Sequence, residues 1–175
     1  MGLFIALNIN KKERARVIRA ARPLREEDLP VRWVVEDDLH LTLKFLGEVG
    51  RERVPAVEEA MARVGESTAP FSMTLGGFGA FPTIRRPRVL WLGVDASPAL
   101  RCLKQDLEWG LTDCGFEAET RAFHPHVTLG RVDAKDGAGA FRGLDAKVAA
   151  MDFSAEIPVR SVDLMRSFLS REGAR

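Results

Sequence analysis

Apolar residues recur along the chain with two periods, one typical of strands and one typical of helices. The run LFIALNI at residues 3–9 predicts a first strand. Further strands are predicted where apolar residues alternate with polar ones or form short apolar runs, at residues 40–43, 71–81, 89–94 and 126–132. One or two closing strands are predicted within residues 153–169.

Helical spacing of apolar residues marks three other segments. The clearest follows Ser97, a predicted N-cap, with Pro98 at the first helical position, a stripe of leucines, and an end at Gly115. That stripe consists of Leu100, Leu103, Leu107 and Leu111. A second helix carries Val54, Val57, Met61 and Val64 and is predicted to end at Gly65. Residues 11–29 predict a polar, Arg-rich helical segment interrupted at Pro23, whereas residues 135–143 predict a loop or a weak helix.

The order of these elements repeats. Leu3 opens a strand 37 residues before His40, and Val89 opens a strand 37 residues before His126. Each half then runs strand, helix, H-x-T-L strand and a further strand, so the halves are roughly residues 1–85 and 86–175. We therefore predict an α+β fold, one domain with two pseudo-symmetric lobes, each an antiparallel sheet with packed helices, on either side of a central cleft.

Composition limits the possible partners and surroundings of the protein. The 175 residues are 46% hydrophobic, enough for one domain with its own core, and 26 Lys and Arg balance 25 Asp and Glu. A net charge of +1 gives no long-range attraction to polyanions, so any phosphate recognition must be local. Cys102 and Cys114 fit no disulfide or metal motif, which suits a reducing cytoplasm, and we expect both in the core on a helix face. The first ten residues match neither a signal peptide nor a membrane span.

Two of the three histidines occupy matching places in the two halves, in HLTL at residues 40–43 and HVTL at residues 126–129. Residues i and i+2 of a strand share a face, so each histidine projects together with the threonine two residues on. A pseudo-two-fold axis would bring the two pairs together across the cleft. The predicted catalytic site consists of His40, Thr42, His126 and Thr128.

Two imidazoles can hold opposite protonation states and serve as general acid and general base in displacement at phosphorus. Threonine hydroxyls can donate hydrogen bonds to the non-bridging oxygens, where charge builds up. A metal site is less favoured, because only Asp37 and Asp38 lie near His40 and no carboxylate lies near residues 123–126. A single H-x-T is more often a half-exposed histidine on a strand, but two matched copies favour a functional site.

Other residues are weaker candidates for phosphate binding. Arg131 falls on the opposite face from His126 by strict alternation, so we expect a bulge at Gly130 or a strand end that lets it reach phosphate. Arg85 and Arg86 belong to a basic loop that could bind an RNA backbone or could simply be solvated. His124 is expected to have a structural role or to lie at the edge of the cleft.

Aromatic residues could stack on a base. Phe81 and Phe123 lie beside polar loops and are the candidates for base stacking, whereas Phe45 is expected in the core.

With both H-x-T-L strands in place, the chain resembles the 2H phosphoesterase superfamily, and in particular its bacterial and archaeal RNA 2',3'-cyclic phosphodiesterases, also called 2'-5' RNA ligases. The resemblance extends over LFIAL, LHLTLKFLGEV, FGAFP, PRVLWLGV, FHPHVTLGRV and VDLMRS. It implies two lobes flanking a water-filled cleft, with Arg131 as the arginine that follows the second motif. It also leads us to expect a Tyr-containing strand after the last glycine, whereas this chain has no Tyr and ends in REGAR, so a terminal strand or cleft edge is expected to be missing.

The resemblance implies hydrolysis of RNA 2',3'-cyclic phosphate ends, or of cyclic nucleotides, to 2'-phosphomonoesters by a cytoplasmic monomer without metal or cofactor. Reversible, ATP-independent 2'-5' joining of RNA is implied as a side activity. The family suggests His40 as proton donor and His126 as proton acceptor, although the sequence alone leaves the two roles interchangeable. Two alternatives stay open: a non-catalytic module that binds RNA ends or nucleotides, and a sister phosphodiesterase acting on 2'-5' oligoadenylate or ADP-ribose cyclic phosphate.

Overall fold

The computed structural model describes residues 1–133, 139–167, 169–170 and 173–174. Its helices are α1 (Lys11–Ala20), α2 (Arg22–Arg25), α3 (Val54–Ser67), α4 (Pro98–Thr112) and α5 (Leu144–Ala150), with short 3-10 turns η1 (Glu36–Asp38) and η2 (Arg51–Arg53). Its strands are β1 (Gly2–Asn8), β2 (Val31–Trp33), β3 (His40–Glu48), β4 (Phe71–Pro82), β5 (Pro87–Val94), β6 (His126–Val132), β7 (Ser154–Val159), β8 (Asp163–Ser167), β9 (Leu169–Ser170) and β10 (Gly173–Ala174).

One large antiparallel sheet has the strand order β7-β4-β5-β6-β3-β1-β8, with β2 paired to β6 beside this path. The fold class predicted from the sequence, α+β with antiparallel sheets, is therefore confirmed. From β4 to β8 the order is symmetric about the β6-β3 contact when β1 is matched with β5, β3 with β6, and β4 with β8. The last strand of each half completes the sheet of the other half, because β8 pairs with β1 and β4 pairs with β5. The division of the chain at residue 85 stays a prediction.

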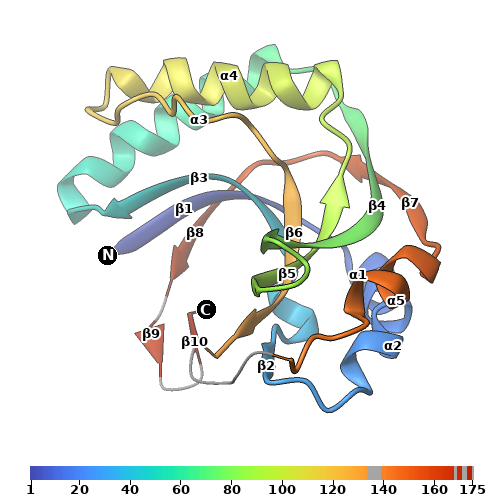
Figure 1. Cartoon of the computed structure of the whole chain (residues 1–175). Coiled ribbons are helices and arrows are strands. Elements are labelled where there is room, and N and C mark those ends of the chain that lie inside the picture. The colour runs from blue at the N-terminus through green and yellow to red at the C-terminus, as the bar shows by residue number, and fades with distance from the viewer. Residues whose placement is uncertain (134–138, 168, 171–172, 175) are drawn as a thin grey trace.

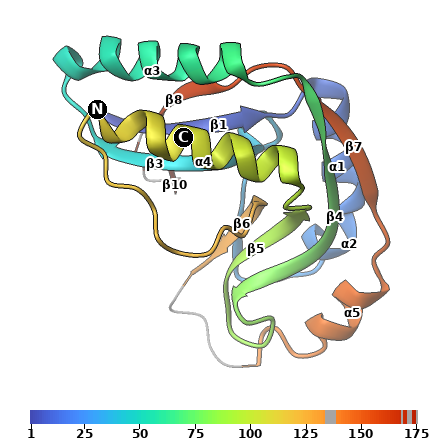
Figure 2. The same cartoon turned by 90° about the horizontal axis from the view of Figure 1, so that it is seen from above.

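Helices cover the sheet in two groups (Figures 1 and 2). In both views α3 and α4 lie side by side, and their apolar faces join the hydrophobic core through residues such as Val57 and Leu103. In Figure 1, α1, α2 and α5 gather at the other end, where Lys147 of α5 forms an ion pair with Glu27 just beyond α2. Core residues come from both groups, so one contiguous core supports both sides of the cleft.

Most predicted elements are confirmed, with small differences at their ends. The helix after Ser97 begins as predicted, because the Ser97 side chain accepts a hydrogen bond from the backbone N–H of Leu100 at 3.3 Å. The helix predicted to stop at Gly65 continues to Ser67. The hydroxyls of Ser67 and Thr68 both donate to the carbonyl of Val64, so side chains cap this end in place of a left-handed glycine.

Two further expectations need comment. Both cysteines are free, and Cys102 is exposed, so placing it in the core was wrong. Cys114 is half-buried just beyond the end of α4 and packs against the core. The leucine stripe and Glu108 form the buried face of α4, which leaves Cys102 on the solvent side of the same helix. Part of the predicted loop or weak helix, residues 135–138, lies outside the described residues. Within the described residues, no helix combines the length and apolar character needed to span a bilayer.

Candidate active site

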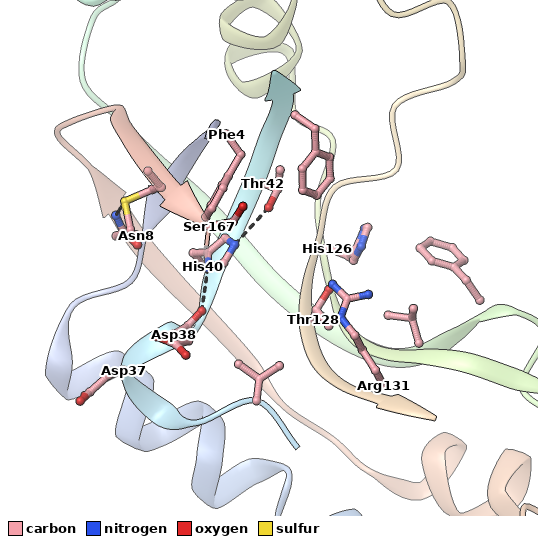
Figure 3. A pocket seen from close by; sticks show the side chains of 15 residues that line it. Phe4, Asn8, Asp37, Asp38, His40, Thr42, His126, Thr128, Arg131 and Ser167 are labelled. Atoms are coloured by element: carbon pink, nitrogen blue, oxygen red, sulfur yellow. Dashed lines mark hydrogen bonds between the residues drawn. The ribbon is translucent and has the colours of Figure 1, made fainter. Parts of the chain in front are cut away.

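The two H-x-T motifs meet where β3 and β6 pair. Leu41 is paired with Val127 in antiparallel register, and both side chains are completely buried. Their neighbours along each strand point to the opposite face, so the cross-strand pairing places the two motifs side by side. All four predicted catalytic residues line one cavity of about 310 Å³ (Figure 3), namely His40, Thr42, His126 and Thr128.

Each histidine is oriented by the backbone two residues before it. Nδ1 of His40 lies 2.6 Å from the carbonyl oxygen of Asp38, and Nδ1 of His126 lies 2.7 Å from the carbonyl oxygen of His124. A carbonyl oxygen only accepts hydrogen bonds, so Nδ1 carries the proton in both rings. Nε2 is therefore the nitrogen that can take up or release a proton, and Nε2 of His40 lies 3.1 Å from Oγ1 of Thr42.

Burial lowers the pKa of His40 below its ordinary value, because desolvation disfavours the charged imidazolium. The positive charge of Arg131 acts in the same direction, whereas the carbonyl and the carboxylate of Asp38 act against it. The net result favours a neutral imidazole at His40 when the cavity holds no anion. The charges of Asp38 and Arg131 thus shift the pKa of His40 in opposite directions.

Aromatic rings flank both imidazoles. The Phe4 ring centroid lies 5.0 Å from that of His40, and the Phe81 ring lies 5.0 Å from His126 in an edge-on arrangement. Trp91 packs against Phe81 with ring centroids 5.1 Å apart and ring planes tilted by 44°, and it can lie there because Gly79 has no Cβ to occupy the space of the indole ring. Phe81, predicted to stack on a base, lines the cavity, and so does Phe4, which the sequence ranked below Phe81 and Phe123 as a base-stacking residue.

Matching bulges turn two further side chains into the cleft. Leu43 in β3 and Leu129 in β6 are each skipped in the pairing with the neighbouring strand, so the alternation of faces changes phase at both. Arg131 consequently lines the cavity beside Thr128, as Figure 3 shows. Phe45 does so as well and is 73% exposed, so its expected place in the core was wrong.

Gly130 is required beside this bulge. A Cβ at Gly130 would lie 2.5 Å from Cγ1 of Val31 and 3.0 Å from Cε3 of Trp33, both on β2. The close approach of β2 to β6 at Trp33 and Gly130 therefore depends on the missing side chain. β2 in turn supports the strand that carries His126 and Arg131.

The remaining wall of the cavity comes from residues outside the predicted site, and among them the sequence pointed only to Asp37 and Asp38, as neighbours of His40. Asn8 lies at the end of β1 and donates a hydrogen bond from Nδ2 to Oδ2 of Asp163 on β8 at 2.7 Å. Other lining residues from this part of the chain are Val34, Asp37, Asp38, Met165 and Ser167. Among the described residues, no group of three or more His, Cys, Asp and Glu side chains is arranged as a metal site would need.

A second cavity, of about 650 Å³, adjoins the first. The residues shared by the two cavities are Thr42, Phe45, Phe81 and His126. Its other walls include Lys104 from α4 and the segment before β6, with Arg121, Phe123 and His124. Phe123 thus lines this second cavity and is absent from the lining of the first, while His124 lies at the edge of the site, where it was expected. Arg85 and Arg86 are exposed in the β4-β5 loop and line neither cavity.

A buried charge network supports β3 beside the second cavity, whose wall includes Lys44 and Lys104. Lys44 and Lys104 donate to the two carboxylate oxygens of Glu108, at 2.6 and 2.7 Å. Lys104 also donates to the carbonyl of Leu43 at 2.6 Å, and Glu108 accepts from the backbone N–H of Glu119 at 2.9 Å. Burial alone would raise the pKa of Glu108, but the hydrogen bonds from the two lysines and from the backbone N–H of Glu119, together with the charge of Lys104, hold the pKa below its ordinary value. The network ties α4 to the histidine strand and to the segment that leads to His126.

Known proteins resemble this chain in sequence and in fold. Residues 11–168 match the family model described as the 2'-5' RNA ligase superfamily. The chain is 36% identical over 132 residues to an RNA 2',3'-cyclic phosphodiesterase of Thermotoga maritima, covering 75% of this chain and 70% of the relative. It is 33% identical over 159 residues to the protein of the same name from Aeropyrum pernix, covering 90% and 89%.

Solved structures agree with the sequence matches. The structure of TT0787 of Thermus thermophilus has a TM-score of 0.82 at 30% identity and covers 100% of this chain and 93% of its own. LigT of E. coli complexed with 3'-AMP has a TM-score of 0.73 at 30% identity, covering 99% of this chain and 92% of its own. Sequence, strand order and the paired H-x-T motifs lead to one conclusion: the chain belongs to the 2'-5' RNA ligase superfamily, the RNA ligase branch of the 2H phosphoesterases.

Proposed function

We propose that the protein hydrolyses RNA 2',3'-cyclic phosphate ends, and 2',3'-cyclic nucleotides, to 2'-phosphomonoesters without a metal ion. The observation that carries the proposal is the pair of imidazoles in one cavity, each with Nδ1 held by a carbonyl and Nε2 available for proton transfer. The names of the Thermotoga and Aeropyrum relatives supply the substrate class.

In the proposed reaction the cyclic phosphate occupies the space between the two motifs. Nε2 of His126 takes a proton from a water molecule as the water oxygen attacks phosphorus. The bond from phosphorus to O3' breaks in line with the attack, and Nε2 of His40 donates the proton that O3' needs to leave as a hydroxyl. The bond to O2' stays intact, so the product is a 2'-phosphomonoester with a free 3'-OH.

Thr42, Thr128 and Arg131 stabilise the phosphoryl oxygens in this scheme. The hydroxyls donate hydrogen bonds to the non-bridging oxygens, and the guanidinium supplies positive charge where negative charge builds up in the transition state. The proton donor must be charged before the reaction, and burial alone lowers the pKa of His40. Binding of an anionic phosphate beside the ring offsets this, because a nearby negative charge favours the imidazolium.

The same chemistry run with an RNA 5'-OH in place of water joins two RNAs through a 2'-5' linkage, without ATP and reversibly. We place the protein in the cytoplasm as a monomer acting on RNA ends. The free cysteines support a reducing compartment, and the complete set of proposed catalytic groups within one chain supports a monomer.

The test is incubation with 2',3'-cyclic nucleotides and with an RNA that ends in a cyclic phosphate, with and without EDTA, followed by identification of the phosphate position. A 2'-phosphate product formed equally well in EDTA supports the proposal. A 3'-phosphate product contradicts O3' as the leaving group. Tight binding without product would favour a non-catalytic binding module, and turnover of only 2'-5' oligoadenylate or ADP-ribose cyclic phosphate would favour a sister phosphodiesterase.

A further inference from the structure

The second cavity combines positive charge with aromatic rings. Lys104 and Arg121 bring cationic groups to its wall, paired with Glu108 and Glu119 respectively, and Phe45 and Phe123 bring aromatic rings. Nζ of Lys104 lies 5.6 Å from the centroid of Phe123, so charge and ring are adjacent. Proteins that bind single-stranded nucleic acid use this combination, with bases on aromatic side chains and phosphates beside cations. A volume of about 650 Å³ lies within the range of small-molecule sites.

The two histidines differ in which cavity they reach. His40 lines only the first cavity, whereas His126 lines both. On the proposed function, His40 protonates O3' of the nucleoside that carries the cyclic phosphate, so that nucleoside belongs in the first cavity. Attack on phosphorus comes from the side opposite O3', next to the base His126. The second cavity therefore lies on the side from which the nucleophile approaches.

We propose that the second cavity binds the nucleoside whose 5'-OH replaces water as nucleophile, that is, the acceptor end in 2'-5' joining. This inference rests on the proposed function. Nε2 of His126 takes the proton from the 5'-OH, the 5'-oxygen bonds to phosphorus, the bond to O3' breaks, and O3' takes the proton from His40. The product is a 2'-5' phosphodiester with a free 3'-OH, and no cofactor is consumed.

Phe123 and Arg121 have different tasks in this site. Phe123 is half-buried and packs against the core with part of its ring, so it is a fixed platform on which the acceptor base stacks. Arg121 has a side chain that is 86% exposed and is held by Glu119, with Nε 2.9 Å from Oε1. It lies where the acceptor strand leaves the protein and attracts its next phosphate.

The reverse reaction gives the sharpest test, because the leaving nucleoside of a 2'-5' linked dinucleotide must then occupy the second cavity. The kcat/KM for cleavage of 2'-5' linked ApA is compared with that for hydrolysis of 2',3'-cyclic AMP. The ratio of the two values cancels any loss of folded enzyme. The variants are Phe123→Leu, which keeps apolar packing but removes the ring, and Arg121→Gln. Arg101→Gln, on the exposed side of α4 and outside both cavities, is the control.

We expect Phe123→Leu to lower the ratio about tenfold, as loss of base stacking does, and Arg121→Gln to lower it less, with the control unchanged. An unchanged ratio in Phe123→Leu overturns the inference, and so does a wild-type protein that hydrolyses the cyclic nucleotide but never cleaves the dinucleotide. If the variants instead lower the kcat/KM for hydrolysis of a dinucleotide that ends in a cyclic phosphate, the second cavity holds the nucleotide upstream of the cyclic phosphate and the inference is wrong. Failure on all substrates refutes the proposed function itself.

Discussion

Phe45 and Arg131 occupy equivalent positions in the two halves, each five residues after a histidine and each turned into the cleft by a bulge at the matching leucine. The two H-x-T strands are therefore not chemically equivalent, because β3 presents the ring of Phe45 to the cleft and β6 presents the guanidinium of Arg131. Arg131 lines only the first cavity, whereas Phe45 lines both. This pair is therefore a chemical difference between two otherwise similar H-x-T motifs.

Replacing Arg131 with Gln should weaken phosphate binding and raise the pKa of His40. The positive charge of Arg131 lowers that pKa, so its removal makes the imidazolium easier to form. NMR titration of the histidine ring protons measures the pKa directly, with Arg85→Gln, in a loop outside the cavities, as control. A pKa of His40 that stays the same or falls in Arg131→Gln would show that the guanidinium does not act on this ring.

The lowered pKa of His40 also predicts how stability depends on pH. Because the folded pKa lies below the unfolded value, the unfolded chain binds more protons between the two, and the free energy of unfolding rises with pH across that interval. The contribution is fully present above the unfolded value, near 6.5, and is lost as the pH falls through the folded pKa. Urea unfolding of the wild type and of His40→Asn at a series of pH values measures it. As the pH falls through this interval, the free energy of unfolding of the wild type should fall relative to that of His40→Asn. A difference in the free energy of unfolding that does not depend on pH would contradict the lowered pKa.

Thr42→Val and Thr128→Val should each lower kcat for cyclic nucleotide hydrolysis by about 10²-fold, with a smaller change in KM. Valine keeps the shape of threonine on a strand but removes the hydroxyl that stabilises the transition state, and loss of one such donor costs about 10²–10³ in kcat. Steady-state kinetics on 2',3'-cyclic AMP provide the check. Activity within about twofold of the wild type in both variants would mean that the hydroxyls do not contact the phosphoryl oxygens.

Removing the carboxylate of the buried network should be costly. Glu108→Gln leaves the charges of Lys44 and Lys104 without a counter-charge, and breaking a buried pair in this way costs about 3–5 kcal/mol in the free energy of unfolding. Glu59→Gln, which breaks an exposed pair with Arg63, is the matched control and should cost at most about 1 kcal/mol. Denaturant unfolding measures both. An equal loss in the free energy of unfolding in the two variants would show that the buried Glu108 ion pairs stabilise the fold no more than the exposed pair of Glu59.

The sequence predicted the four residues of the two motifs because strand periodicity and the repeat act locally. It failed where alternation breaks, and a bulge at Leu43 moved Phe45 from the expected core to the cleft. It also could not find Asn8, whose neighbour Asp163 joins it only through the pairing of β1 with β8. The carbonyls that orient the two histidines carry no side-chain signal at all, since any residue supplies one.

In the proposed mechanism, His40 and His126 act together without a metal ion. This is tested by the kcat/KM for 2',3'-cyclic AMP hydrolysis by the wild type, His40→Asn, His126→Asn and the double variant, each with and without EDTA. We predict a loss of about 10²–10⁴-fold in either single variant, a double variant little worse than the singles, and no effect of EDTA. A single variant with wild-type activity, or activity abolished by EDTA, would contradict the account.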